Sequence, residues 1–360
     1  MPSSPPQDGS FMRSALVLAL LFLSSTLVAR PAPKILFQSQ SKQQHEHKQE
    51  TEVETKTDES PSEKIKTEPT KSEPTKTEPT KTEPTKSEPI NEVSAESGVT
   101  FANPVKNRWR VGAKMRGGNR SVKNMLITIP VPTEWPEQEV RLHNENFPIE
   151  VQSADYRDLN SGVRQLVLKI PKLKAKQLIE IDVTFDVTIS QTLPPADTSQ
   201  FKIPKRIPKE IKDYIGVSPQ ISYRNAKLRK QVKDILAEKE NAWDQVEAIF
   251  DWVRENIEYR GDEPSDALTV FRKRSGCSED LVGLFVAMCR AGKIPARMVW
   301  VDGAQYAEFH LVDAQDRGHW FPCHVAGRRE FGANMEPKVI QQKGDNIKVP
   351  EKKERQKFCA

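Results

Sequence analysis

The sequence predicts an α+β protein in which an N-terminal β-sandwich precedes a mixed core. Two changes in hydropathy period favour this class. Between residues 98 and 200 apolar residues alternate with polar ones, most regularly over residues 179–187, which is typical of half-buried strands. After about residue 210 the apolar residues recur at helical spacing, so amphipathic helices are expected there. A length of 360 residues leaves room for roughly two domains.

A long charged segment precedes the predicted strands. Residues 38–96 contain nine Lys, fourteen Asp or Glu and six Pro, and they contain no aromatic residue. Such a segment cannot bury enough apolar surface to offset the entropy of ordering it, so residues 31–97 are predicted to be a disordered linker. Five repeats of five residues, of the type Lys-Thr-Glu-Pro-Thr, occupy residues 66–90. They are interpreted either as a stiffened spacer or as a repeat with no role beyond solvation.

Composition excludes several classes of protein. The net charge is +5, and the folded part has no dense basic arm, so a dedicated nucleic-acid binder is not expected. Four Cys in 360 residues are too few for a disulfide-built scaffold. No metal-ligand spacing, phosphate loop or dinucleotide fingerprint is found, and no cofactor is expected.

The N-terminus predicts export. Arg13 precedes an apolar run over residues 15–23, and small residues follow it, which is the pattern of a secretory signal peptide. The run is shorter than the about 20 residues that a membrane span needs. Residues 1–30 are therefore predicted to be a signal peptide, and the protein is expected to be secreted or held in the periplasm or cell envelope. The alternative is an uncleaved membrane anchor.

A cysteine is predicted at the start of a helix. Ser275 and Gly276 interrupt the helical pattern, and a new apolar face begins at Leu281, which places Cys277 at or just before a helix N-terminus. Exposed amides and the positive end of the helix dipole stabilise a thiolate, lowering its pKa from the free value of about 8.5. Nearby acidic residues act in the opposite direction. Cys289, twelve residues further on, is about 18 Å away along the helix, so it cannot pair with Cys277.

Two motifs around this cysteine carry a family resemblance. Gly276-Cys277 is followed at residues 290–297 by Arg-Ala-Gly-Lys-Ile-Pro-Ala-Arg. With these motifs, residues 244–303 resemble the core of the transglutaminase-like superfamily of papain-type thiol enzymes, and the resemblance extends over most of residues 200–335. It implies an exported, bacterial-type member with a papain-like α+β core and Cys277 as nucleophile. A protein or peptide would be the substrate or partner.

The remainder of the family's catalytic triad does not match. Members of the family have a strand that begins His-x-aromatic-x-Glu and a later Trp-x-x-x-Asp strand. In this chain Tyr306 and Glu308 match the first pattern and Trp320 matches the second. The resulting register places Ala304 at the position of the general base and His324 at the position of the orienting Asp.

Two functions therefore stay open. In one, His324 acts directly on Cys277 as a thiolate–imidazolium dyad, giving a cysteine acyltransferase or a protease-like hydrolase of peptide or amide bonds. In the other, the fold is retained without catalysis and binds a peptide or cell-envelope partner. The oligomeric state is not predicted. The expected organisation is a signal peptide over 1–30, a linker over 31–97, a β-sandwich over 98–200, a transglutaminase-like core over 201–345 and a charged C-terminal tail over 346–360.

Overall fold

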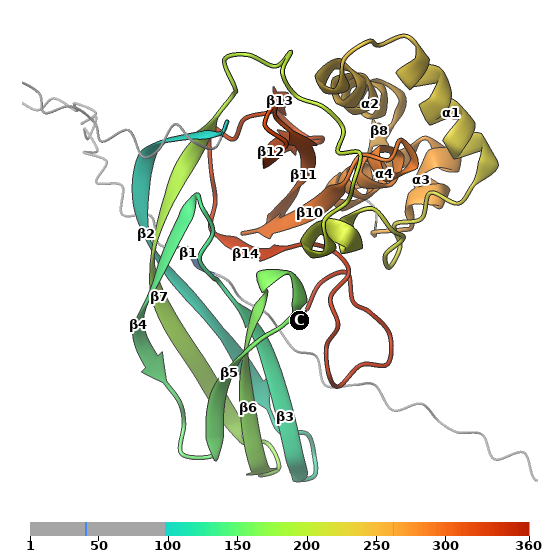
Figure 1. The fold of residues 1–360 in the computed structure, drawn as a ribbon. Helices are drawn as coiled ribbons and strands as arrows, with labels where there is room; N and C mark the ends of the chain where they lie inside the picture. The colour runs from blue at the N-terminus through green and yellow to red at the C-terminus, as the bar shows by residue number, and fades with distance from the viewer. Residues whose placement is uncertain (1–39, 42–97, 262, 360) are drawn as a thin grey trace, which may run out of the picture. The chain divides into compact units, whose positions relative to one another are not determined.

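The computed structural model describes residues 40–41, 98–261 and 263–359 (Figure 1). These residues belong to one compact unit, Ile35–Ala360. The predicted signal peptide and almost all of the predicted linker lie outside the described residues. One short strand within the linker range, β1 (Gln40–Ser41), pairs antiparallel with β2 at Trp109 and Arg110.

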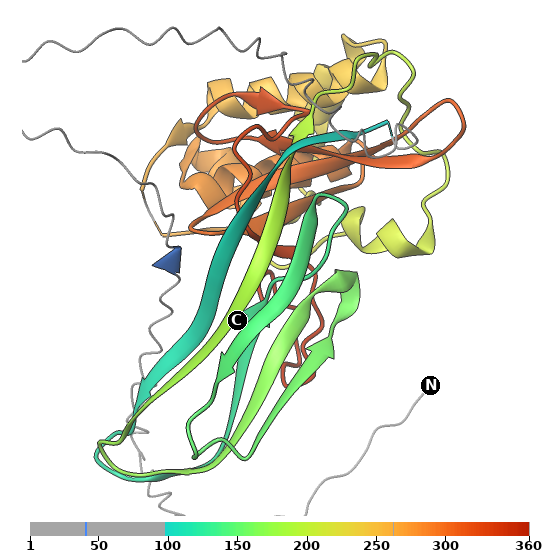
Figure 2. The ribbon, with the colours of Figure 1, turned by 90° about the vertical axis from the view of Figure 1, so that its left-hand side faces the viewer.

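Two antiparallel sheets follow along the chain. One has the strand order β1-β2-β7-β4 and the other has the order β3-β6-β5. Figure 2 shows β2 and β7 running side by side over most of their length. The strands are β2 (Thr100–Arg116), β3 (Val122–Val131), β4 (Gln138–Asn146), β5 (Ser153–Asp158), β6 (Arg164–Leu173) and β7 (Leu178–Leu193), with a 3-10 turn, η1 (Asn160–Gly162), before β6.

The alternation of apolar and polar residues along the chain corresponds to alternating buried and exposed side chains in the strands. Along β7 nearly every second side chain is buried, which confirms the half-buried strand predicted over residues 179–187. Buried residues from both sheets, among them Trp109, Leu168 and Ile181, form one hydrophobic cluster.

Helices and a third sheet make up the second half of the chain. The sheet has the order β13-β12-β11-β10-β14, and the mixed α and β class predicted from the sequence is confirmed. The elements are η2 (Lys209–Tyr214), α1 (Ala226–Ala237), α2 (Ala242–Asn256), β8 (Glu258–Tyr259), α3 (Ala267–Lys273), β9 (Ser275–Gly276), α4 (Ser278–Ala291), β10 (Ala296–Val301), β11 (Ala304–Val312), β12 (Gly318–His324), β13 (Glu330–Phe331) and β14 (Ile340–Lys343).

Asparagine side chains cap the N-termini of α1 and α2. The side-chain oxygens of Asn225 and Asn241 accept backbone N–H groups in the first turns of α1 and α2, satisfying donors that have no partner within the helix. Behind these caps, the predicted apolar stripes are buried, with Val232 in α1 and Val246 and Val253 in α2 among them. None of the helices in the described residues is long and apolar enough to cross a membrane.

The two faces of the third sheet have different neighbours. Buried residues of α4 share a cluster with Met298, Phe309 and Cys323, so α4 covers the face that carries these side chains. On the opposite face, Tyr306 packs in a cluster with Ile189 of β7. Because successive side chains of a strand point to opposite faces, neighbouring residues of β11 and β12 meet entirely different surroundings.

Candidate functional site around Cys277

Cys277 is the N-cap of α4, as the sequence predicts. Its sulfur accepts the backbone N–H of Asp280, and the Asp280 carboxylate accepts the backbone N–H of Cys277 at 3.0 Å. The other carboxylate oxygen accepts the backbone N–H of Ser265 at 2.7 Å. Glycine is needed at position 276 because a Cβ there would lie 2.7 Å from the Cβ of Asp280. The Gly-Cys pair therefore allows the capping box to close.

The electrostatics of the thiol differ from the sequence expectation. Burial raises the pKa of Cys277, and the charge of the Asp280 carboxylate raises it further. The backbone N–H groups of Asp280 and Glu279 lower the pKa but do not outweigh those two effects. The sequence predicts a lowering by the helix N-terminus and an opposing effect of the acidic residues, and the net direction is upward because the thiol is partly desolvated beside a carboxylate.

His324 ends β12 and has its own set of partners. Its ring stacks on Tyr306 with centroids 5.2 Å apart, and its Nε2 lies 3.2 Å from Asn334 Oδ1. Glu330 lies 3.9 Å from the same nitrogen. Arg254 of α2 donates hydrogen bonds to the carbonyl groups of His324 and the following residue, both at 3.0 Å. These contacts fix the end of β12 and give the ring a stacking partner and a hydrogen-bond partner.

The two predicted catalytic side chains are not joined. Cys323 packs in the cluster that contains α4, so the adjacent His324 points to the opposite face of the sheet, where Tyr306 lies. Among the described residues, no hydrogen bond links the Cys277 thiol to His324 or to any other histidine. Burial lowers the pKa of His324, although Glu330 and Asn334 act in the opposite direction. The assignment of these two residues as catalytic stays a prediction.

The remaining positions of the expected triad are occupied as follows. Ala304 is the first residue of β11, opposite Val301 of β10, and its methyl group supplies no base. His310 lies further along β11, opposite Trp320. His319 lies within β12, where its Nε2 is 3.0 Å from a carboxylate oxygen of Asp313.

Residues 229–327 match the family model of the transglutaminase-like superfamily. The chain carries a transglutaminase-like domain. Among solved structures, the chain is similar to a proposed cysteine protease from Cytophaga hutchinsonii, with 18% identity over 68% of this chain and 83% of that chain and a TM-score of 0.52. A proposed protease from Parabacteroides distasonis matches with 8% identity over 62% of this chain and 68% of that chain and a TM-score of 0.24. No curated protein matches the chain.

The matched Arg and Glu of the transglutaminase-like domain form a buried ion pair. Arg297 Nε donates to Glu308 Oε2 at 2.7 Å, and the two residues lie opposite each other on β10 and β11. Lys343 of β14 donates to Glu308 Oε1 at 2.6 Å and also pairs with Glu137. Burial would raise the pKa of Glu308, but the cations of Arg297 and Lys343 hold it below its usual range. These charged residues form one buried network that joins β10, β11 and β14.

Sequence reasoning missed Asn334 and Lys343. Both residues contact partners that are distant in the sequence, His324 for Asn334 and Glu308 for Lys343. Neither residue lies in a local pattern that predicts this contact. Asn334 becomes the partner of His324 because its backbone bridges to Thr192 of β7. Lys343 is the one charged residue of β14, and nothing in that short segment predicts that its side chain is buried.

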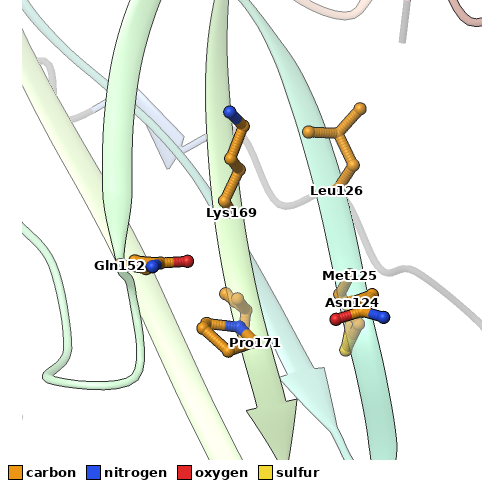
Figure 3. Close-up of a pocket in the computed structure, with 7 residues that line it drawn as sticks. Asn124, Met125, Leu126, Gln152, Lys169 and Pro171 are labelled. Atoms are coloured by element: carbon orange, nitrogen blue, oxygen red, sulfur yellow. The ribbon is translucent and has the colours of Figure 1, made fainter.

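A pocket on the first half of the chain is separate from this site. It encloses about 280 Å³ on β3 and β6. Figure 3 shows two of its lining residues, Lys169 and Leu126, on neighbouring strands. None of its lining residues belongs to the transglutaminase-like domain, and none is a cysteine, histidine or carboxylate; they are Asn124, Met125, Leu126, Gln152, Lys169, Ile170 and Pro171.

Proposed function

We propose that this chain is a transglutaminase-like module that binds a polypeptide partner and does not catalyse acyl transfer. The observation that carries the proposal is that, among the described residues, no histidine is hydrogen-bonded to the Cys277 thiol. A thiol enzyme needs a base within about 2.6–3.2 Å of the nucleophile. Ala304 occupies the matched base position, and His324 is hydrogen-bonded to Asn334 instead.

The electrostatics support the same proposal. A thiolate–imidazolium dyad forms when the thiol has a low pKa and the imidazole has a high one. Burial shifts both groups the other way, raising the pKa of Cys277 and lowering that of His324. At neutral pH both side chains are then uncharged, which suits a structural or binding role.

The setting of the module is part of the proposal. We infer that the two antiparallel sheets form the β-sandwich predicted over residues 98–200, since their buried residues share one cluster. We also propose that the protein acts in the cell envelope or outside the cell, because the apolar run over residues 15–23 has the pattern of an export signal. The partner would then be an extracytoplasmic polypeptide.

A catalytic function is the second candidate. Cys277 is partly exposed at a helix N-terminus, where backbone N–H groups can stabilise an oxyanion. The structure from Cytophaga hutchinsonii is described as a proposed cysteine protease, and that description favours hydrolysis over transfer to an amine. This candidate requires the His324 imidazole to reach the thiol, because Ala304 supplies no base.

Turnover assays separate the two candidates. The full chain is incubated with a glutamine-containing protein and a fluorescent primary amine, and separately with a peptide library analysed by mass spectrometry. We expect the wild type to show no more product than Cys277→Ala. Wild-type turnover that is abolished in Cys277→Ala would refute the binding module. In that case, loss in His324→Ala but not in the β4 variant His143→Ala would support the dyad.

A further inference from the structure

Lysines and arginines gather at one end of the first two sheets. β2 ends at Arg116 and β7 begins at Leu178, and these two residues lie opposite each other. The turns that follow β2 and β6 are bonded to each other, since the N–H of Gly117 donates to the carbonyl oxygen of Gln177 at 2.8 Å. Figure 2 shows both turns at the lower end of these strands. We call the exposed cations at this end the basic tip; they are Arg116, Arg120, Lys123, Lys172, Lys174 and Lys176.

The charge of the basic tip is not neutralised from within the described residues. None of its six side chains forms an ion pair there, whereas the neighbouring Lys114 pairs with Glu180 at 3.4 Å. Another carboxylate at this end, that of Glu150, accepts a hydrogen bond from a glutamine side chain. Lys123 and Lys172 lie directly opposite each other on β3 and β6. Like charges in this arrangement are destabilising, so an anionic surface beside the basic tip would stabilise it.

Exposed apolar side chains lie among these cations. Ile149, in the turn between β4 and β5, is 97% exposed, and the adjacent Glu150 connects this turn to the one before β7. Val122 and Leu178, which adjoin the turns of the basic tip, are 44% and 46% exposed. Basic and apolar side chains on one surface are typical of proteins that lie on anionic lipid. A polyanion without an apolar layer would leave these three side chains in water, at a cost in free energy.

We propose that the basic tip is a docking surface for an anionic phospholipid membrane, with Ile149 entering the layer between the headgroups and the acyl chains. Each lysine or arginine close to such a surface adds attraction that extends over about a Debye length, and burial of Ile149 adds an apolar contribution. The surface contains no residue of the site around Cys277. The inference therefore goes beyond the proposed polypeptide binding and does not depend on it.

Vesicle binding tests the role of the charges. The full chain is sedimented with vesicles of phosphatidylcholine and with vesicles that also contain phosphatidylglycerol. The tip variant replaces three of its lysines by glutamine, K172Q, K174Q and K176Q. The matched control removes three exposed lysines in and just after α1, K227Q, K233Q and K239Q. All these proteins carry the same N-terminal apolar run, so its contribution to sedimentation is common to them. We expect the tip variant to bind the anionic vesicles about a hundredfold more weakly than the wild type, at about fivefold per charge, and the control variant to keep the wild-type affinity.

Quenching of tryptophan fluorescence by brominated lipid tests which residue meets the membrane. Ile149→Trp places the probe at the tip, and Val105→Trp places it near the other end of β2, at a side chain that is 52% exposed. We expect anionic vesicles to quench Ile149→Trp more than the wild type, and to quench Val105→Trp no more than the wild type.

Equal quenching of the two tryptophan variants, or equal vesicle binding by the tip variant and its control, would overturn the proposal. Heparin serves as a soluble polyanion without an apolar layer. Heparin binding that falls in the tip variant, with no added quenching at position 149, would assign the basic tip to a soluble polyanion and overturn the membrane proposal as well.

Discussion

His310 is a histidine that is buried beside a permanent cation. It is 5% exposed, and its Nδ1 has no hydrogen-bond partner among the described residues. Its ring lies 5.0 Å from that of Trp320, and the guanidinium of Arg297 lies 4.0 Å from the same Trp320 ring. Burial lowers the pKa of His310 to about 4, and the charges of Arg297 and His319 contribute. Protonation of this ring is therefore unfavourable in the folded state.

Replacing His310 is expected to reduce the loss of stability in acid. The pKa of His310 is about 4 when folded and about 6.5 when unfolded, so the unfolded state binds more protons between these values. Stability is therefore full above pH 6.5 and falls as the pH drops towards 4, by up to about 3 kcal/mol. Urea unfolding at pH 7.5 and pH 4.5 should show a smaller difference for His310→Leu than for the wild type. Equal differences in the two proteins would contradict the prediction.

Three residues, Gly276, Cys277 and Asp280, together form the N-terminal cap of α4. Gly276 leaves room for the Asp280 side chain, Asp280 caps the helix, and Cys277 lies between them. The same carboxylate that closes the helix end also raises the pKa of the thiol. Helix capping and thiol reactivity are thus opposed at this position, and the cap limits the reactivity.

Asp280→Asn is expected to separate these two effects. Removing the negative charge should lower the pKa of Cys277, measured from the pH dependence of its alkylation rate. Weakening the cap should reduce stability to urea by about 1 kcal/mol. Asp266→Ala removes the N-cap side chain of α3 and is the matched control. It should cost similar stability without moving the Cys277 pKa, and a pKa shift of equal size in both variants would count against the role of Asp280.

On the scale of the whole described unit, buried polar contacts join the first sheets to β14 of the third sheet. Gln138 of β4 donates to the carbonyl oxygen of Ile340 at 3.0 Å and accepts its N–H at 2.7 Å. The ion pair between Glu137 and Lys343 lies next to this contact. Buried polar groups that lose a partner pay the cost of desolvation, so these contacts couple the two regions energetically.

We expect residues 98–359 to unfold in one cooperative transition. Gln138→Ala leaves both backbone groups of Ile340 unpaired and should cost about 1–3 kcal/mol. Far-UV circular dichroism and tryptophan fluorescence should give coincident urea transitions that shift together. Gln152→Ala, which changes an exposed glutamine, should have little effect. Two separate transitions, of which only one responds to Gln138→Ala, would show that the regions fold independently.

The sequence by itself determined the features that depend on near neighbours. The alternation over residues 179–187 predicts a half-buried strand, and the interruption at Ser275 and Gly276 predicts that a helix starts after Cys277; both are confirmed. The family motifs likewise predict the transglutaminase-like domain that residues 229–327 match. Such signals are local because periodicity and capping involve residues only a few positions apart.

Only the tertiary structure decided how the candidate site is connected. Asn334 as the partner of His324, the face on which His324 lies, and the contact of Lys357 with Glu279 all join segments that are distant or unpatterned in the sequence. The net pKa direction of Cys277 also depended on the fold, because burial outweighed the helix N-terminus. Desolvation and partner choice depend on which surfaces pack together, and that is set by the whole domain, beyond the reach of residue spacing.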